Sequence, residues 1–161
     1  MTPAETSAEI EKLHAAGFAW SMACCGRNRE GAEDVLQASY LKILDGRARF
    51  AGRSSFKTFL FGVIRRTAAE QRRRTAIRRV IFASAIPAQP PAGEGASVDR
   101  LAFRSALARL ARRQREVLEL VFSMGMTLQE ASETLSISVG SARVHYDRGK
   151  KRLTAVLKRR S

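Results

Sequence analysis

The stretch that decides the fold is TLQEASETLSISVGSARVHYDRGKKR, residues 127–152. Thr127 and Glu130 have the spacing of a capping box, which predicts a short helix ending near Leu135. Ser138 can cap a second, longer helix, and only a tight segment separates the two. A short helix, a tight turn and a longer basic helix have the proportions of a helix-turn-helix, whose second helix enters a DNA major groove.

The second helix of this motif has an apolar and a polar face. Its inner stripe at helical spacing comprises Ala142, Tyr146, Gly149, Leu153 and Val156. Its outer face carries Ser141, Arg143, Val144, Asp147 and Arg148. Because arginine and serine reach base edges and phosphates, we predict DNA contacts from Ser141, Arg143, His145, Arg148 and Lys151. The alternative is a helical hairpin with a solvated basic face.

The charge of the chain is strongly positive and unevenly distributed. The 161 residues include 29 Lys and Arg against 15 Asp and Glu, a net charge of +14, which is typical of polyanion binders. Residues 1–46 hold 4 basic and 7 acidic residues, residues 47–80 hold 11 and 1, and residues 100–161 hold 14 and 5. The two basic segments indicate two nucleic-acid contacts, and the acidic segment indicates a different partner.

Several classes of protein are disfavoured by the composition. No apolar run reaches the roughly 18 to 20 residues of a membrane span, and the N-terminus lacks the order of a signal peptide. We therefore expect a cytoplasmic protein without membrane insertion. Cys24 and Cys25 are adjacent, which strains a disulfide and matches no metal-ligand spacing, so we expect both to be reduced and mostly buried. We expect no metal, cofactor or catalytic residue.

The first half of the chain predicts a three-helix bundle. A cap at Thr2 with Pro3 and Glu5 begins a first helix that reaches about Cys25. Asn28 can cap a second helix, with the apolar stripe Val35, Leu36, Tyr40, Ile43 and Leu44 and a stop at Gly46. The third begins after Ser54 or Ser55 and continues into residues 72–74.

The second half predicts a separate helical domain. Prolines and glycines between Pro87 and Gly95 indicate a flexible linker over residues 83–97. Beyond it, Ser97 can cap a helix through Leu110, and another helix runs from about Arg113 to Met124. No alternating strand pattern occurs anywhere, so the expected fold is all-α, with domains over 1–82 and 98–161 joined by the linker.

Four stretches of the sequence resemble one known family. They are AEDVLQ (32–37) followed by Tyr40-Leu41, FAGRSSFKTFLF (50–61), LARRQREVL (110–118) and ISVGS (137–141). The family they resemble is the extracytoplasmic-function (ECF) group of bacterial sigma-70 factors. The first stretch resembles its polymerase-binding helix, the second its promoter-opening segment, and the last two its −35-reading domain. The resemblance covers nearly the whole chain. Ala38, Phe59, Thr67 and Ser136 depart from it, standing where an acidic residue, Trp, Asn and Gly are usual.

The resemblance implies a function and a set of site residues. It implies a non-enzymatic subunit that binds core RNA polymerase, directs it to specific promoters and helps to melt the −10 region, and that is often held by an anti-sigma factor. The implied polymerase-binding residues are Glu33, Asp34, Gln37 and Tyr40. The implied −10 residues are Phe50, Ser54, Phe61, Arg65, Arg66, Thr67 and Arg73, with Phe50 and Thr67 lining a pocket for a flipped base.

Two other functions compete with this reading. One is a plain repressor or activator that uses the helix-turn-helix while the N-terminal bundle dimerises. The other is a site-specific recombinase, which needs a nucleophilic serine beside clustered arginines. Its only candidates, Ser54 and Ser55, precede a helix as caps. The repressor leaves the aromatic and arginine-rich segment 50–74 unexplained. Phe56 and Phe59 can be ordinary core residues, whereas Phe61 lies on the other face of its helix.

Overall fold

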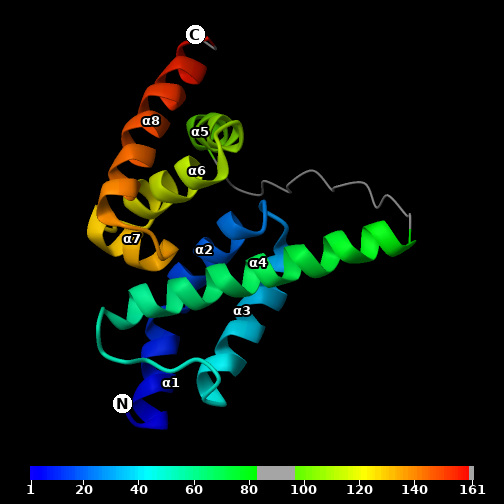
Figure 1. The fold of residues 1–161 in the computed structure, drawn as a ribbon, viewed down its shortest axis with the longest axis vertical. Helices are drawn as coiled ribbons and strands as arrows, with labels where there is room; N and C mark the ends of the chain where they lie inside the picture. Colours follow the sequence, from blue (N-terminus) through cyan, green and yellow to red (C-terminus); the bar gives the residue numbers. More distant parts are fainter. Residues whose placement is uncertain (83–96, 160–161) are drawn as a thin grey trace. The chain divides into compact units, whose positions relative to one another are not determined.

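The computed structural model describes residues 1–82 and 97–159, and all regular structure in these ranges is helical (Figure 1). The chain divides into two compact units, Met1–Pro91 and Ala92–Ser161. The all-α prediction is therefore confirmed. The expected linker over 83–97 lies, apart from Ser97, outside the described residues.

Within residues 1–82, the first unit contains four helices where three were expected. These are α1 (Pro3–Lys12), α2 (His14–Cys24), α3 (Arg29–Leu44) and α4 (Phe56–Phe82). The expected single helix from Thr2 to about Cys25 is divided at Leu13, whose φ of −97° and ψ of 5° depart from helical values. The bend allows α1 to contact α3 while α2 packs on both α3 and α4.

Local capping sets the ends of these helices. The Asn28 side chain accepts a hydrogen bond of 2.8 Å from the Gly31 N–H at the start of α3. After α3, Gly46 has a φ of +81°, the left-handed conformation that glycine adopts readily. Ser55 Oγ accepts from the Thr58 N–H at 3.1 Å and begins α4. The predictions for Asn28 and Gly46 are confirmed.

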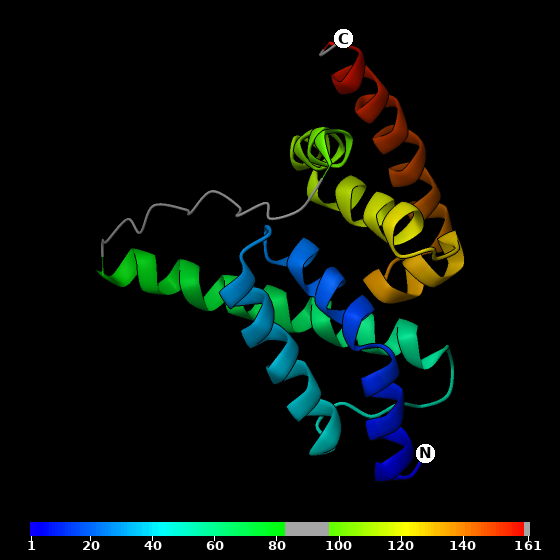
Figure 2. The same ribbon diagram turned by 180° about the vertical axis from the view of Figure 1, so that it is seen from behind.

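The core of the first unit is centred on Trp20. Its ring stacks on Phe61 with centroids 5.9 Å apart, and its Nε1 donates to the Phe61 carbonyl oxygen at 3.0 Å. The polar end of the indole is thereby satisfied inside the core, as a buried tryptophan requires. Other buried apolar residues of this core are Val35, Leu36, Ile43, Leu60, Val63, Ile64 and Ala68. Helix α4 crosses α2 and α3 along this core (Figure 2).

The second unit contains α5 (Val98–Ala108), α6 (Arg112–Leu118), α7 (Leu128–Leu135) and α8 (Val139–Lys158). Helix α6 continues into a π-helical turn, Glu119–Ser123, which the sequence pattern did not indicate. The predicted caps Ser97, Thr127 and Ser138 are confirmed, and Thr127 forms the full capping box with Glu130.

Helices α6 and α8 approach each other closely at Gly149. A Cβ at this position would lie 3.1 Å from Leu118 Cδ1 and 3.3 Å from Gln114 Cβ. Because both distances are shorter than ordinary van der Waals contact, a larger residue here would require Leu118 and Gln114 to shift by a few tenths of an ångström. The neighbouring core contains Ala106, Leu107, Leu110, Leu118, Leu153 and Val156.

Candidate nucleic-acid interface

Helices α7 and α8 are joined by the tight turn that a helix-turn-helix requires. Ser136 has a φ of +55° and a ψ of +44°, a left-handed conformation uncommon for a residue other than glycine. The Ser136 N–H donates to the Glu133 carbonyl at 3.3 Å, and the Ile137 N–H donates to the Ser132 carbonyl at 3.0 Å. This pair of bonds is a Schellman motif. Ser138 Oγ then accepts from the Ser141 N–H at 3.0 Å and begins α8.

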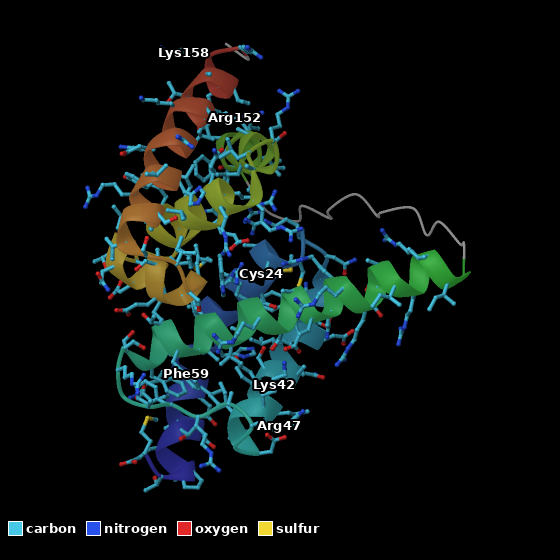
Figure 3. All side chains as sticks on the ribbon, in the orientation of Figure 1. Cys24, Lys42, Arg47, Phe59, Arg152 and Lys158 are labelled. Atoms are coloured by element: carbon cyan, nitrogen blue, oxygen red, sulfur yellow. The ribbon has the colours of Figure 1, made fainter. Side chains whose placement is uncertain are left out.

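Helix α8 separates its buried and exposed residues as the pattern predicts. Ala142, Gly149, Leu153 and Val156 are buried, and Tyr146 is half-buried. Of the predicted DNA-binding residues, Arg143, Arg148 and Lys151 are exposed, whereas Ser141 and His145 are half-buried. Arg152 and Lys158 carry the basic character further along the helix (Figure 3). The exposed side of α8 is thus a basic surface on a rigid element.

A cluster of three phenylalanines anchors the loop between α3 and α4. The Phe50 ring centroid lies 5.5 Å from that of Phe56 and 5.4 Å from that of Phe59, and the latter two are 5.7 Å apart. Phe56 is buried, whereas Phe50 and Phe59 are half-buried. Phe59 lies near the start of α4 in Figure 3. The loop therefore presents part of an aromatic surface to solvent.

Two predicted −10 residues are in the core. Phe61 is 0% exposed and stacks on Trp20. Thr67 is 2% exposed, and its hydroxyl donates to the Val63 carbonyl at 2.8 Å. The expectation that Phe61 lies on the other face of its helix is therefore wrong, and neither side chain is accessible on the surface of the folded chain. Because α4 packs on both α2 and α3, its buried face is wider than a stripe facing a single neighbour.

Lys42 joins α3 to α4 beside Thr67. Its Nζ donates to Thr67 Oγ1 at 3.0 Å and to Glu70 Oε2 at 2.7 Å. The hydrogen bond from Lys42 holds the pKa of the Glu70 carboxyl below its ordinary value, with help from the charges of Lys42, Arg74 and Arg73. Figure 3 shows Lys42 on α3. Sequence reasoning missed this bridge because its partners are 25 and 28 positions away.

The arginines of α4 differ in their surroundings. Arg66 and Arg73 are exposed, whereas Arg65 is half-buried. Arg72 is also half-buried, and its Nη1 donates to the Cys24 carbonyl at 2.9 Å, where it satisfies an acceptor at the end of α2. Beyond Arg72, the exposed cations of α4 are Arg73, Arg74, Arg78 and Arg79. The second basic surface therefore lies on α4.

The outer face of α3 carries the predicted polymerase-binding residues. Glu33, Asp34 and Gln37 are exposed, and Glu33 pairs with Arg29 at 3.1 Å. Tyr40 lies at the edge of this face: it is half-buried, its hydroxyl lies 3.0 Å from His14 Nδ1, and burial raises its pKa.

Two leucines extend this outer face. Leu41 is 59% exposed and Leu44 is 54% exposed, so the assignment of Leu44 to the inner stripe was wrong. Both follow Gln37 at helical spacing, by four and seven positions. That spacing was the signal that could have found them. We call Glu33, Asp34, Gln37, Leu41 and Leu44 the outer face of α3.

The two adjacent cysteines lie at the end of α2 and just after it. Cys24 and Cys25 are free and half-buried, which is less buried than expected, and burial raises the pKa of Cys25. Among residues 1–82 and 97–159, no three His, Cys, Asp or Glu side chains gather as metal ligands would. Within the same ranges, no helix combines the length and the hydrophobicity needed to span a bilayer.

Comparisons with known proteins match both units. Residues 12–77 match the model of Sigma-70 region 2, and residues 100–153 match that of Sigma-70 region 4. The chain is 28% identical over 136 residues to the ECF RNA polymerase sigma factor EcfG of Rhodopseudomonas palustris (strain TIE-1), covering 81% of this chain and 73% of that protein. It is 28% identical over 135 residues to the ECF RNA polymerase sigma factor SigX of Bacillus subtilis (strain 168), covering 78% and 70%.

Solved structures share the fold. The sigma factor RpoE of Bartonella quintana, in complex with the anti-sigma factor NepR, superposes with a TM-score of 0.76 at 24% identity, covering 96% of this chain and 97% of that one. CnrH, in complex with the cytosolic domain of CnrY, superposes with a TM-score of 0.67 at 20% identity, covering 97% and 89%. Since the two family models together cover well over half of its length, the chain belongs to the sigma-70 family, in its ECF group.

Proposed function

We propose that this sigma factor binds core RNA polymerase, directs it to specific promoters and helps to melt their −10 region. In this proposal, residues 1–82 bind the polymerase and the −10 element, and residues 98–161 bind the −35 element. The observation that carries the proposal is that the first unit has two surfaces of different chemistry. The outer face of α3 is acidic and apolar, whereas the loop before α4 and α4 itself are aromatic and basic.

The outer face of α3 is suited to a protein partner. Protein interfaces have an apolar centre and a polar rim, and Leu41 and Leu44 supply exposed apolar groups next to Glu33, Asp34 and Gln37. Because this face has no surplus positive charge, DNA phosphates are not attracted to it. Tyr40 supports this face from its edge through its contact with His14. We therefore assign core polymerase to α3.

The loop before α4 is suited to an unpaired base. Phe50 is held against Phe56 and Phe59, yet it remains half-exposed. Stacking a base on an aromatic ring contributes about 1–3 kcal/mol, comparable with the few kcal/mol needed to unstack it. Ser54 lies in the same loop, half-buried. With Phe61 and Thr67 in the core, the pocket for a flipped base is assigned to the Phe50 and Ser54 side of the loop.

Cations on α4 are suited to the backbone of the melted strand. Arg66 and Arg73 are exposed on α4, and Arg65 is half-buried on the same helix. Phosphate contacts of this kind attract any strand, whereas the aromatic loop acts only on a base that has left the duplex. In this proposal the arginines of α4 contribute to promoter binding, and the aromatic loop contributes to promoter opening.

Helix α8 is suited to the −35 duplex. Arg143 and Arg148 lie on its exposed side, where a guanidinium can reach base edges or phosphates in the major groove. Lys151 lies further along the same side and is assigned to a phosphate. Ser141 and His145 are half-buried and flank this surface.

An anti-sigma factor is a further partner in this proposal. RpoE and CnrH share the fold of this chain. RpoE was solved in complex with the anti-sigma factor NepR, and CnrH was solved in complex with the cytosolic domain of CnrY. A protein that covers the outer face of α3 would prevent polymerase binding. A competition experiment tests this part of the proposal: a bound anti-sigma factor should prevent core polymerase from binding the purified chain.

Transcription with purified core polymerase tests the main proposal. Core enzyme with the chain should produce run-off transcripts from a subset of genomic fragments that core enzyme alone does not transcribe. Permanganate should modify unpaired thymines near the −10 position of those fragments. Specific duplex binding by the chain without transcription or melting would instead support the alternative of a plain repressor or activator. That alternative does not account for the match of residues 12–77 to Sigma-70 region 2.

A further inference from the structure

The exposed face of α8 has an apolar residue at its centre. Val144 is 45% exposed, and nine positions separate it from the buried Leu153. At 3.6 residues per turn, nine positions are two and a half turns, so the two side chains point in opposite directions. Val144 therefore lies opposite the buried stripe, on the part of α8 that would reach deepest into a groove.

Burial in the folded domain accounts for only part of the Val144 side chain. A β-branched residue is a weaker helix former than alanine because its side chain loses χ1 freedom. Burial normally compensates for this loss, but Val144 remains about half exposed. Arg143, Arg148 and Lys151 are exposed around it, together with one acid, Asp147, so its surroundings carry a net positive charge. An apolar group within a basic frame matches duplex DNA better than it matches an apolar protein surface.

Gly140 lies one turn before Val144 and is also unexplained by the fold. A Cβ at Gly140 would meet only Ser138 Oγ, at 4.0 Å, so no contact requires a glycine. Gly149, in the same helix, would by contrast bring a Cβ to 3.1 Å from Leu118 Cδ1. Glycine is a poor helix former. At Gly140 its missing side chain leaves space on the exposed face beside Val144, which lets another molecule approach the helix closely.

We infer that Val144 is a specificity-determining residue that packs against the C5-methyl group of a thymine in the −35 element. The thymine methyl is the one apolar group on the base edges of the major groove, and apolar side chains read it by contact. The inference rests on the proposed reading of the −35 element by α8. It adds an apolar contact to the polar contacts assigned to Arg143 and Arg148.

Removal of single methyl groups from the DNA tests this inference. A −35 duplex is first selected from a random library with the full chain bound to core polymerase. Each thymine is then replaced in turn by deoxyuridine, which lacks only the methyl group. One replacement should weaken closed-complex formation by wild type about fourfold, the factor equivalent to about 0.8 kcal/mol for one buried methyl-sized group. V144A should bind the thymine duplex more weakly and should be insensitive to that replacement.

A matched variant controls for valine removal itself. Val98 is 83% exposed on α5, outside the helix-turn-helix. V98A should retain the full sensitivity of wild type to the same deoxyuridine. If V144A shows the same penalties as wild type at every thymine, Val144 reads no methyl group and the inference is wrong. If wild type does not distinguish the selected duplex from a scrambled one, the proposed −35 reading itself fails.

Discussion

Lys42 Nζ lies 2.7 Å from Glu70 Oε2, and this ion pair connects α3 to α4. The same ammonium donates to Thr67 at 3.0 Å, so it holds two positions about one turn apart on α4. Helix α3 carries the surface assigned to core polymerase, and α4 follows the aromatic loop assigned to the −10 element. Lys42 therefore adds a polar contact between the two helices that carry the proposed surfaces, beside their apolar packing.

The Lys42 bridge makes the stability of the chain sensitive to acid. The pKa of Glu70 is held below its ordinary value of 4.5 in the folded state, so its contribution to stability is present at neutral pH. It is lost as the pH falls through that lowered pKa, when the carboxylate becomes protonated. Lys42→Met should lower the free energy of unfolding at pH 7.

The measurement is urea denaturation at a series of pH values between about 7 and 3. The difference between wild type and Lys42→Met should shrink toward the acidic end of the series. Lys12→Met is a matched control, since Lys12 forms an exposed pair with Glu9 within one helix. A constant difference at all pH values would show that Lys42 stabilises the fold by packing and not through Glu70.

The exposed leucines of α3 should matter for the polymerase and not for the fold. Leu44→Ser removes an apolar group that is 54% exposed, so its effect on stability should be within about 0.5 kcal/mol. If Leu44 lies at the apolar centre of the interface, affinity for core polymerase should fall by about 1–2 kcal/mol. A fluorescence titration with core enzyme measures this affinity. Unchanged affinity of the Leu41→Ser, Leu44→Ser double variant would remove both from the interface.

Phe50 should separate promoter opening from promoter binding. Phe50→Ala should leave closed complexes nearly intact and should weaken opening by the stacking energy of about 1–3 kcal/mol. Part of the deficit should persist on a pre-melted template, because a bubble removes the cost of unpairing but does not restore the stacking surface. Arg73→Ala should instead lose affinity on every template, with a shallower salt dependence.

Permanganate footprinting and filter binding at several salt concentrations measure these two effects. Phe56 provides a control for packing, since it contacts Phe50 but is buried, and Phe56→Leu should leave opening close to wild type. If Phe50→Ala opens promoters as wild type does, Phe50 only packs against its neighbours and the pocket lies elsewhere.

Glycine at position 136, in the turn between α7 and α8, should stabilise the fold. Ser136 adopts a left-handed conformation, with a φ of +55°, which is unfavourable by roughly 1–2 kcal/mol for a residue with a Cβ. Glycine relieves this strain but loses more entropy on folding. Ser136→Gly should therefore raise the free energy of unfolding by about 0.5–1 kcal/mol. Thermal denaturation measures the change, and a lower Tm would show that the serine side chain itself stabilises the turn.

The sequence by itself determined where most helices begin and which class of fold they form. The caps at Thr2, Asn28, Thr127 and Ser138 were predictable because a capping side chain bonds to a backbone N–H only three residues ahead. The buried stripe of α8 was predictable for the same reason, since helical spacing is a local property. The family motifs added the order of the two units.

Only the tertiary structure decided which residues of the first unit are accessible. Helix α4 is packed by both α2 and α3, so Phe61 lies in the core although it was expected on the other face of its helix. The bend at Leu13, the exposure of Leu44 and the Lys42 bridge likewise depend on how helices pack. Periodicity along one helix specifies a direction around its axis, whereas the number and position of neighbouring helices specify how much of that circumference is buried.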